Sequence, residues 1–262
     1  MTLPMKRLTP EEIGKLDPYQ FMAELGKQVI HPGGKRSTAE VYSMADLRRG
    51  QRVLDIGCGV GTTAIEIAQQ FECNVVASDI DTSMLEKADA KARRAGIARQ
   101  FTIKRADIQN MPFADNEFDT VIVEAVTMFV NRDQAVSEIH RVCKSGGRVV
   151  EHEFVWRKKP TPEARKIFEG EVCPGIKFDT TDDWLKLYET HGFRNEKSAT
   201  GPFVMMSPTG FVQDEGIGGT LAMMRKTFSR SAYLRKMMWL TPRILRVRSS
   251  LGYVVFSCTK VA

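Results

Sequence analysis

The chain has 262 residues, of which 42% are hydrophobic, and a formal net charge of +6 that permits anionic partners without identifying one. It holds no run of about eighteen apolar residues, so no membrane span is expected, and its N-terminus lacks the apolar core of a secretion signal. The five cysteines form no C-x-x-C pair, which is typical of a reduced cytoplasmic protein and argues against a disulfide framework or a zinc site.

Apolar runs and turn residues predict strands that alternate with helices. Residues 1–48 are expected to be mostly helical, with a loop at His31–Gly34. Strands are expected at 52–56, 74–78, 101–104, 119–124, 147–154, 193–199 and 252–260. Helices are expected at 61–70, 82–95, 131–143 (closed by Gly146–Gly147), 161–170 and 181–191 (capped by Gly192). This alternation indicates an α/β protein with a mostly parallel sheet and crossover helices.

The segment 201–250 interrupts the alternation. From Gly216 to Ser250 it carries eight Arg or Lys and no acid, while Leu221, Met224 and Phe228 recur at helical spacing. One interpretation is a lid that forms an apolar substrate pocket and docks on an anionic bilayer. The other is an insertion whose methionines and aromatic residues pack on the domain while its charges face water. We expect four parts: a helical cover (1–48), an α/β core (49–200), a lid (201–250) and a last strand (251–262).

The stretch Val53–Gly61 reads VLDIGCGVG, an apolar strand that breaks into three glycines at alternate positions. Glycine tolerates positive φ and lets a ligand lie against bare backbone, so this loop predicts a small-molecule site. A dinucleotide fingerprint needs G-x-G-x-x-G, but Thr62 stands where its third glycine would be. The spacing therefore weighs against an NAD(P)-dependent oxidoreductase.

Ordered matches across residues 37–160 resemble the class I S-adenosylmethionine-dependent methyltransferases. Besides the glycine loop, they are Ser78–Ile80 after the second strand, Arg105–Ile108 after the third, Asn110–Val123 into the fourth, and Glu138–Gly147 before the fifth. In the last match Cys143 and Ser145 replace the usual Leu and Pro, both at structural positions. The resemblance implies a Rossmann-like, seven-stranded, mostly parallel sheet with helices on both faces. To this sheet the predicted elements add a helical N-terminal cover and a helical insertion before the last strand.

The resemblance further implies S-adenosylmethionine as the cofactor. Asp79 would accept hydrogen bonds from both ribose hydroxyls, and Asp107 would take the adenine amino group. Gly33–Thr38 is similar to a segment that closes over the methionine end of the cofactor in such enzymes. The cofactor-binding residues expected are Thr38, Asp55, Gly57, Cys58, Gly59, Gly61, Thr62, Asp79, Ile80, Asp107, Ile108 and Glu124.

Candidate catalytic residues follow from the position of ligands in open α/β sheets, beyond the carboxyl ends of the strands. That rule selects Glu124 and Thr127 after the fourth strand, and residues 151–153 at the end of the fifth, where alternation puts His152 opposite its two glutamate neighbours. We expect catalytic roles for His31, Glu124 and His152, substrate contacts from Tyr19, Thr127, Glu153, Met206 and Trp239, and no metal site. Purely structural roles stay open for both histidines.

The residues and the resemblance together predict a cytoplasmic enzyme, in part peripheral to the membrane. It would move a methyl group to a small, rather apolar acceptor by in-line displacement. The similarity is to quinone, amine and sterol methyltransferases. The expected partners are a small-molecule substrate and an anionic membrane surface, with no nucleic acid, for a monomer or homodimer.

Three alternatives stay open. The basic charge suggests a nucleic-acid methyltransferase, although the fourth strand ends in Val123–Val126 rather than an Asn/Asp-Pro-Pro-aromatic motif. An NAD(P)-dependent oxidoreductase and a cofactor binder without catalysis are the other two.

Overall fold

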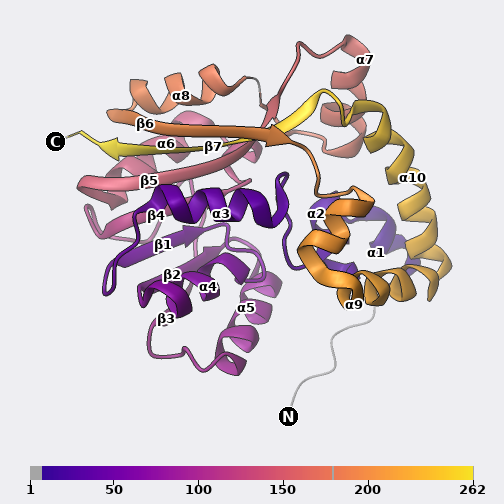
Figure 1. Ribbon diagram of the computed structural model, residues 1–262, viewed down its shortest axis with the longest axis horizontal. Coiled ribbons are helices and arrows are strands. Elements are labelled where there is room, and N and C mark those ends of the chain that lie inside the picture. The colour runs from indigo at the N-terminus through magenta and orange to yellow at the C-terminus, as the bar shows by residue number, and fades with distance from the viewer. Residues whose placement is uncertain (1–7, 179, 262) are drawn as a thin grey trace.

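Seven strands form one sheet in the computed structural model, in the order β3-β2-β1-β4-β5-β7-β6 (Figure 1). The structure describes residues 8–178 and 180–261, so residues 1–7 of the predicted cover and residue 262 of the predicted last strand lie outside the described residues. The strands are β1 (Arg52–Ile56), β2 (Asn74–Asp79), β3 (Phe101–Arg105), β4 (Phe118–Glu124), β5 (Cys143–Trp156), β6 (Phe193–Pro202) and β7 (Leu251–Lys260). Strand β7 runs antiparallel to β5 and β6, and the other pairs are parallel. The predicted mostly parallel sheet is confirmed.

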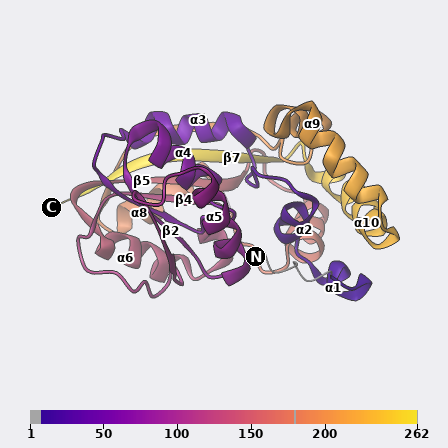
Figure 2. The same ribbon diagram turned by 90° about the horizontal axis from the view of Figure 1, so that it is seen from below.

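Helices cover both faces of the sheet (Figure 2). They are α1 (Pro10–Lys15), α2 (Pro18–Leu25), α3 (Gly34–Ala45), α4 (Thr62–Phe71), α5 (Thr82–Arg94), α6 (Arg132–Val142), α7 (Pro162–Arg165), α8 (Thr181–Thr190), α9 (Pro208–Phe228) and α10 (Ser231–Val247). A 3-10 turn, η1, spans Thr127–Phe129, and a π-helical segment, η2, spans Lys166–Val172. Among the described residues, no helix is long and apolar enough to cross a bilayer.

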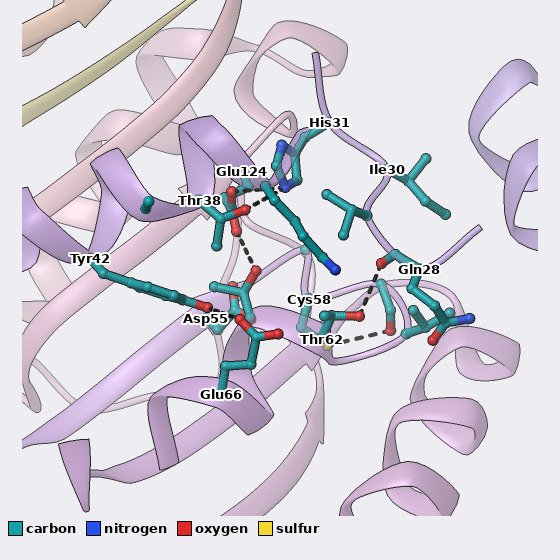
Figure 3. Close-up of a pocket in the computed structure, with 17 residues that line it drawn as sticks. Gln28, Ile30, His31, Thr38, Tyr42, Asp55, Cys58, Thr62, Glu66 and Glu124 are labelled. Atoms are coloured by element: carbon teal, nitrogen blue, oxygen red, sulfur yellow. Dashed lines mark hydrogen bonds and ion pairs between the residues drawn. The ribbon is translucent and has the colours of Figure 1, made fainter. Parts of the chain in front are cut away.

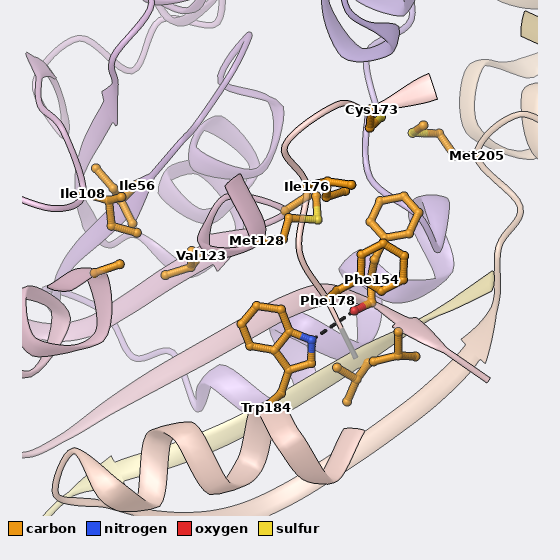
Figure 4. Close-up of a cluster of buried hydrophobic side chains, with 14 of the residues drawn as sticks. Ile56, Ile108, Val123, Met128, Phe154, Cys173, Ile176, Phe178, Trp184 and Met205 are labelled. Atoms are coloured by element: carbon orange, nitrogen blue, oxygen red, sulfur yellow. Dashed lines mark hydrogen bonds between the residues drawn. The ribbon is translucent and has the colours of Figure 1, made fainter. Parts of the chain in front are cut away.

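Neighbouring strand residues enter two different apolar layers. Val53 packs with buried residues of α3 and α4, while the next residue, Leu54, belongs to the layer that includes α6 and α8. Figure 4 shows part of the second layer, where Trp184 of α8 donates its indole N–H to the carbonyl of Phe154 at 3.0 Å. Because strand side chains alternate and both faces are covered, the inner strands β1, β2 and β4 read as largely apolar runs in the sequence, whereas β3 and β6 are mostly exposed and polar.

The predicted role of Gly146–Gly147 is wrong. Gly146–Gly147 does not close the helix predicted at 131–143: α6 stops at Val142, and the pair lies inside β5. There β5 pairs with β4 across a register shift between Phe118 and Thr120, and Gly146 has φ +71°. The glycines therefore serve an irregular strand start. The helix predicted at 161–170 begins at Pro162 and continues as the π-helical segment η2.

Four helices gather beyond the carboxyl ends of the parallel strands, on the right of Figure 1. The N-terminal helices α1 and α2 contact α10 and α9 respectively, so the predicted cover and the predicted insertion pack together. In α9, Gly216 leaves the helical conformation with φ 70° and ψ 174°, which divides this element in two.

A buried ion pair joins these two parts of the chain. Lys27, just after α2, is fully buried and donates to Asp214 of α9 at 2.7 Å. The Glu215 carboxylate accepts the backbone N–H groups of Gln28 (3.0 Å) and Val29 (3.3 Å). The first half of α9 therefore fixes the segment that follows α2.

The insertion corrects one interpretation. Met205 and Met223 are buried, as packing predicts, but Leu221, Met224 and Phe228 face solvent. Met224 and Phe228 therefore depart from the expected packing of methionines and aromatic residues, because the apolar face of this half of α9 points outward.

Replacing Lys27 by Ala should lower the free energy of unfolding by about 3–5 kcal/mol, because the Asp214 carboxylate would stay buried without its cation. Urea denaturation measures this loss. Lys15→Ala is the matched control, because Lys15 pairs with Glu11 at 2.6 Å on the surface, where water screens the charges. Equal losses in the two variants would contradict the structural role of Lys27.

Candidate functional site

The glycine loop lies at the carboxyl end of β1. Gly57, Gly59 and Gly61 all have positive φ, at 75°, 52° and 76°. A Cβ added at Gly57 would lie 2.1 Å from a methyl of Val126, whereas one at Gly59 would meet nothing within 4 Å. Gly59 thus presents bare backbone to open space, which is the geometry of a ligand seat.

Two cavities meet at this loop. The first contains Thr38, Asp55, Cys58 and Thr62, and Figure 3 shows it. The second contains Asp79, Ile80, Asp107 and Ile108. Both are lined by Ile30, Gly57, Gly59, Val60 and Glu124. Because they share these walls, the two cavities adjoin at the glycine loop.

Gly61 is the exception among the expected cofactor-binding residues, because it lines neither cavity. A Cβ there would lie 2.8 Å from the Cβ of Ala88 on α5. The missing side chain therefore permits close packing of α4 against α5.

Asp79 ties the loop to the end of β2. One carboxylate oxygen accepts the Gly59 N–H at 2.9 Å and the other accepts the Asp81 N–H at 2.9 Å. Burial raises the pKa of Asp79, and these backbone hydrogen bonds oppose that rise. Each carboxylate oxygen has a second lone pair, so Asp79 can also accept hydrogen bonds from a ligand in the second cavity.

Asp55 brings an unsatisfied acceptor to the first cavity. It is buried, and within the described part of the chain its Oδ2 atom has no hydrogen-bond partner. Burial, and then the charges of Glu124 and Asp79, raise its pKa well above the usual range. A buried carboxyl in this state suits a cationic hydrogen-bond donor, such as an ammonium group, which would favour its ionised form.

His31, Glu124 and His152 converge beside this cavity. His152 Nδ1 lies 3.1 Å and His31 Nε2 3.6 Å from the same Glu124 oxygen. The other Glu124 oxygen accepts the Thr63 hydroxyl at 2.6 Å. The cluster therefore joins the loop before α3 to the ends of β4 and β5. One side-chain donor atom from each of His31, Glu124 and His152 lies within 4.8 Å of the other two, which is close enough for all three residues to share a cation.

Hydrogen bonds assign the tautomer of His31. The Ser37 hydroxyl donates to the Gly34 carbonyl at 2.8 Å, so it accepts from His31 Nδ1–H at 3.2 Å. The bare Nε2 can then accept the Thr38 hydroxyl at 3.0 Å. Burial lowers the pKa of His31 to about 4, against the smaller opposing effect of Glu124.

Glu124 is ionised in this cluster. Burial alone would raise its pKa, but the two histidines and the Thr63 hydroxyl together lower it to about 2. At neutral pH the cluster therefore combines a carboxylate with a neutral His31, at the junction of the two cavities.

The predicted substrate residues divide into three groups. Tyr19 lines the second cavity, and its buried hydroxyl has no partner among the described residues. Thr127 and Glu153 lie behind the cavity wall, where one Glu153 oxygen accepts the N–H groups of Val126 (3.0 Å) and Thr127 (2.7 Å). Met206 and Trp239 line neither cavity, contrary to the expectation.

Glu151 and His152 lie on opposite sides of β5, as alternation predicts. Glu151 accepts the Tyr188 hydroxyl. Burial raises the pKa of Glu151 to about 7 and raises that of Glu153. Glu151 Oε1 and Glu153 Oε2 have no hydrogen-bond partner among the described residues, so a proton shared between the two carboxyls would satisfy both oxygens.

Sequence reasoning missed Thr63 and Lys35. Thr63 is the second residue of α4, one position beyond the expected Thr62, and helix geometry could have pointed it toward the sheet. Lys35 lines the first cavity from α3 and lies within the segment Gly33–Thr38 described above. Nothing in the sequence marks this lysine.

Family, sequence and structure comparisons each find proteins that are similar to this chain. Residues 54–150 match the family model described as a methyltransferase domain. An uncharacterized Haemophilus influenzae protein is 32% identical, over 83% of this chain and 86% of that protein. The uncharacterized methyltransferase YodH of Bacillus subtilis is 30% identical, over 68% of this chain and 75% of YodH. The crystal structure of the [4+2]-cyclase SpnF superposes with a TM-score of 0.74 at 20% identity, over 97% of each chain, and shows the shared fold.

Histidine NMR titration should find His31 uncharged down to about pH 5, because burial lowers its folded-state pKa to about 4. The pKa of a histidine in the unfolded chain is about 6.5, so between about pH 4 and pH 6.5 the unfolded state binds more protons than the folded state. The stabilisation is therefore complete above about pH 6.5 and is lost as the pH falls toward 4.

His31→Gln assigns the signal and should remove this part of the pH dependence, worth up to about 1.4 kcal/mol per pH unit between pH 6.5 and 5. Glu151, whose pKa is raised by burial, makes the stability change with pH in the opposite direction in both the wild type and His31→Gln. The difference between the two proteins therefore isolates the effect of His31. A His31 signal that titrates near pH 6.5 would refute the buried, neutral state.

Proposed function

The chain belongs to the small-molecule branch of the class I S-adenosylmethionine-dependent methyltransferases, and we propose that it methylates a small, rather apolar acceptor held beyond the carboxyl ends of β4 and β5. The comparisons give no support to the nucleic-acid or oxidoreductase alternatives. What the family leaves open is which residues hold the cofactor and the acceptor.

The observation that carries the proposal is the pair of adjoining cavities with different chemistry. In the second cavity, Asp79 and Asp107 would hold the ribose and the adenine amino group. In the first cavity, the orphaned Oδ2 of Asp55 would accept the ammonium group of the methionine part. The bare backbone of Gly59 lines both cavities, where a Cβ would fill the seat. The residues present therefore fit S-adenosylmethionine.

The bound cofactor supplies a methyl group on a sulfonium cation, already activated for transfer. The protein has to align the acceptor with that methyl and exclude water. Glu124, at the junction of the cavities, would place its carboxylate charge near the cationic part of the cofactor. His152 and Thr63 would fix the orientation of this carboxylate through the hydrogen bonds described above.

The protonation states limit what the cluster can do. A general base works best with a pKa near the operating pH, but the pKa of His31 is about 4 and that of Glu124 about 2. Both are therefore weak proton acceptors at neutral pH. We assign His31 and Glu124 to charge placement and positioning, which suits an acceptor that carries a free lone pair.

The acceptor would enter beside the N-terminal cover. Tyr19, Ile30, Val126, Phe129 and Val130 give the second cavity an apolar wall near Glu124. This wall supports the apolar acceptor, and Tyr19 would donate its unpaired hydroxyl to a polar group on it. Thr127 and Glu153 would act indirectly, by shaping the loop after β4. We further propose a cytoplasmic monomer or homodimer that touches anionic membranes peripherally.

Thermal unfolding with added ligands tests the cofactor. S-adenosylmethionine and S-adenosylhomocysteine should raise the melting temperature, because a ligand that binds only the folded state stabilises it. NADH and NADPH should leave it unchanged. Stabilisation by a nicotinamide cofactor alone would overturn the proposed function.

Asp79→Ala should weaken S-adenosylhomocysteine binding by about 1.5–3 kcal/mol, because the ribose hydroxyls lose a charged acceptor and the Gly59 N–H loses its partner. Isothermal titration calorimetry measures the loss. Asp89→Ala removes an exposed carboxylate of α5 and should leave the affinity unchanged. Unchanged affinity in Asp79→Ala would remove Asp79 from the site.

A further inference from the structure

The outer helices carry most of the exposed apolar surface. Of the ten large apolar side chains that the described residues expose, seven lie on α9 and α10. Four of them recur along α9 at intervals of four, three and four residues, and so share one side of this helix: Ile217 (71% exposed), Leu221 (59%), Met224 (50%) and Phe228 (67%). On α10, Met238 (66%) and Leu245 (51%) stand seven residues apart, again on one side. Solvated apolar stripes of this kind mark contact surfaces.

Basic residues accompany these stripes. Arg225 follows Met224 on α9, Arg235 precedes Met238 by one turn of α10, and Arg246 follows Leu245. All three are exposed, and no acid occurs between Gly216 and Ser250. The two helices pack against each other and form the outer end of the molecule in both views (Figures 1 and 2). We call the four apolar residues of α9, the two of α10 and these three arginines the outer face.

We propose that the outer face docks on an anionic phospholipid surface, with its apolar side chains in the headgroup region and its arginines on lipid phosphates. Apolar stripes flanked by Arg and Lys are typical of helices that lie in a membrane interface. The alternative occupant, a second copy of this chain, would bring two basic segments without acids together. Like charges repel, whereas anionic lipid headgroups attract each arginine.

The position of the outer face connects it to the active site. Gly216 breaks α9 directly before Ile217. On the other side of the break, Asp214 and Glu215 bind Lys27, Gln28 and Val29. Gln28 and Val29 line the first cavity. Docking would therefore place the bilayer next to the segment that covers the site, where an apolar acceptor could pass from lipid to protein. This last step rests on the proposed function, while the docking itself does not.

Vesicle flotation tests the proposal with the full chain. The protein should float with phosphatidylcholine vesicles that contain phosphatidylglycerol, should bind pure phosphatidylcholine at least about tenfold more weakly, and should lose binding at high salt. Arg225→Ser with Arg235→Ser should weaken binding roughly 25-fold, because each basic residue near the surface contributes about fivefold. Arg94→Ser with Arg99→Ser makes the same change in net charge at exposed positions elsewhere and should change binding less than about twofold.

The apolar stripe has its own variant. Ile217→Ser with Leu221→Ser and Phe228→Ser should abolish flotation, whereas Val261→Ser removes one exposed apolar side chain outside the outer face and should not. S-adenosylhomocysteine binding should survive in the triple variant, which shows that it is folded. Failure of the wild type to float would overturn the docking proposal. A wild-type dimer in solution that becomes monomeric only in the triple variant would also overturn it. Flotation without cofactor binding would instead refute the proposed function and leave the docking standing.

Discussion

The carboxylate of Asp79 connects the two parts on which the site depends, the end of β2 and the glycine loop after β1. It accepts the Gly59 N–H at 2.9 Å, in a loop whose three glycines all have positive φ. Because Gly59 has no side chain, the backbone on the cavity side stays bare. The loop can then serve as the shared wall of two cavities, one polar at Asp55 and one lined by Asp79 and Asp107. Without this geometry the cavities would have no common seat for a long ligand.

Charge around that seat has the opposite sign to the chain as a whole. The chain carries +6, but Asp55, Asp79 and Glu124 line the site. Burial raises the pKa of both Asp55 and Asp79, and the charges of Glu124 and Asp79 raise that of Asp55 further. A ligand with a sulfonium and an ammonium group relieves this crowding, since its positive charges favour the ionised carboxylates. The excess positive charge gathers elsewhere, including the outer face.

Much of the fold could be predicted because burial on both faces makes the inner strands β1, β2 and β4 largely apolar runs, and glycines mark the loop after β1. Contacts between distant residues could not be predicted in this way. Lys27 and Asp214 are 187 residues apart, and no sequence pattern near either residue indicates that they form an ion pair. His31 and His152 were each singled out, but only the folded chain brings both to one oxygen of Glu124. The helical spacing of Leu221, Met224 and Phe228 predicts an apolar face but not whether it points inward or outward. Gly146–Gly147 was misplaced because the same residues suit a helix end and an irregular strand start.

If the two cavities form one binding site for S-adenosylmethionine, a crystal structure with S-adenosylhomocysteine will show a single ligand that spans both. Its ribose hydroxyls should lie on Asp79, its adenine beside Asp107 and Ile108, and its ammonium group at Asp55. A ligand with its ribose in the cavity of Asp55, or one bound away from Gly57 and Gly59, would contradict this arrangement.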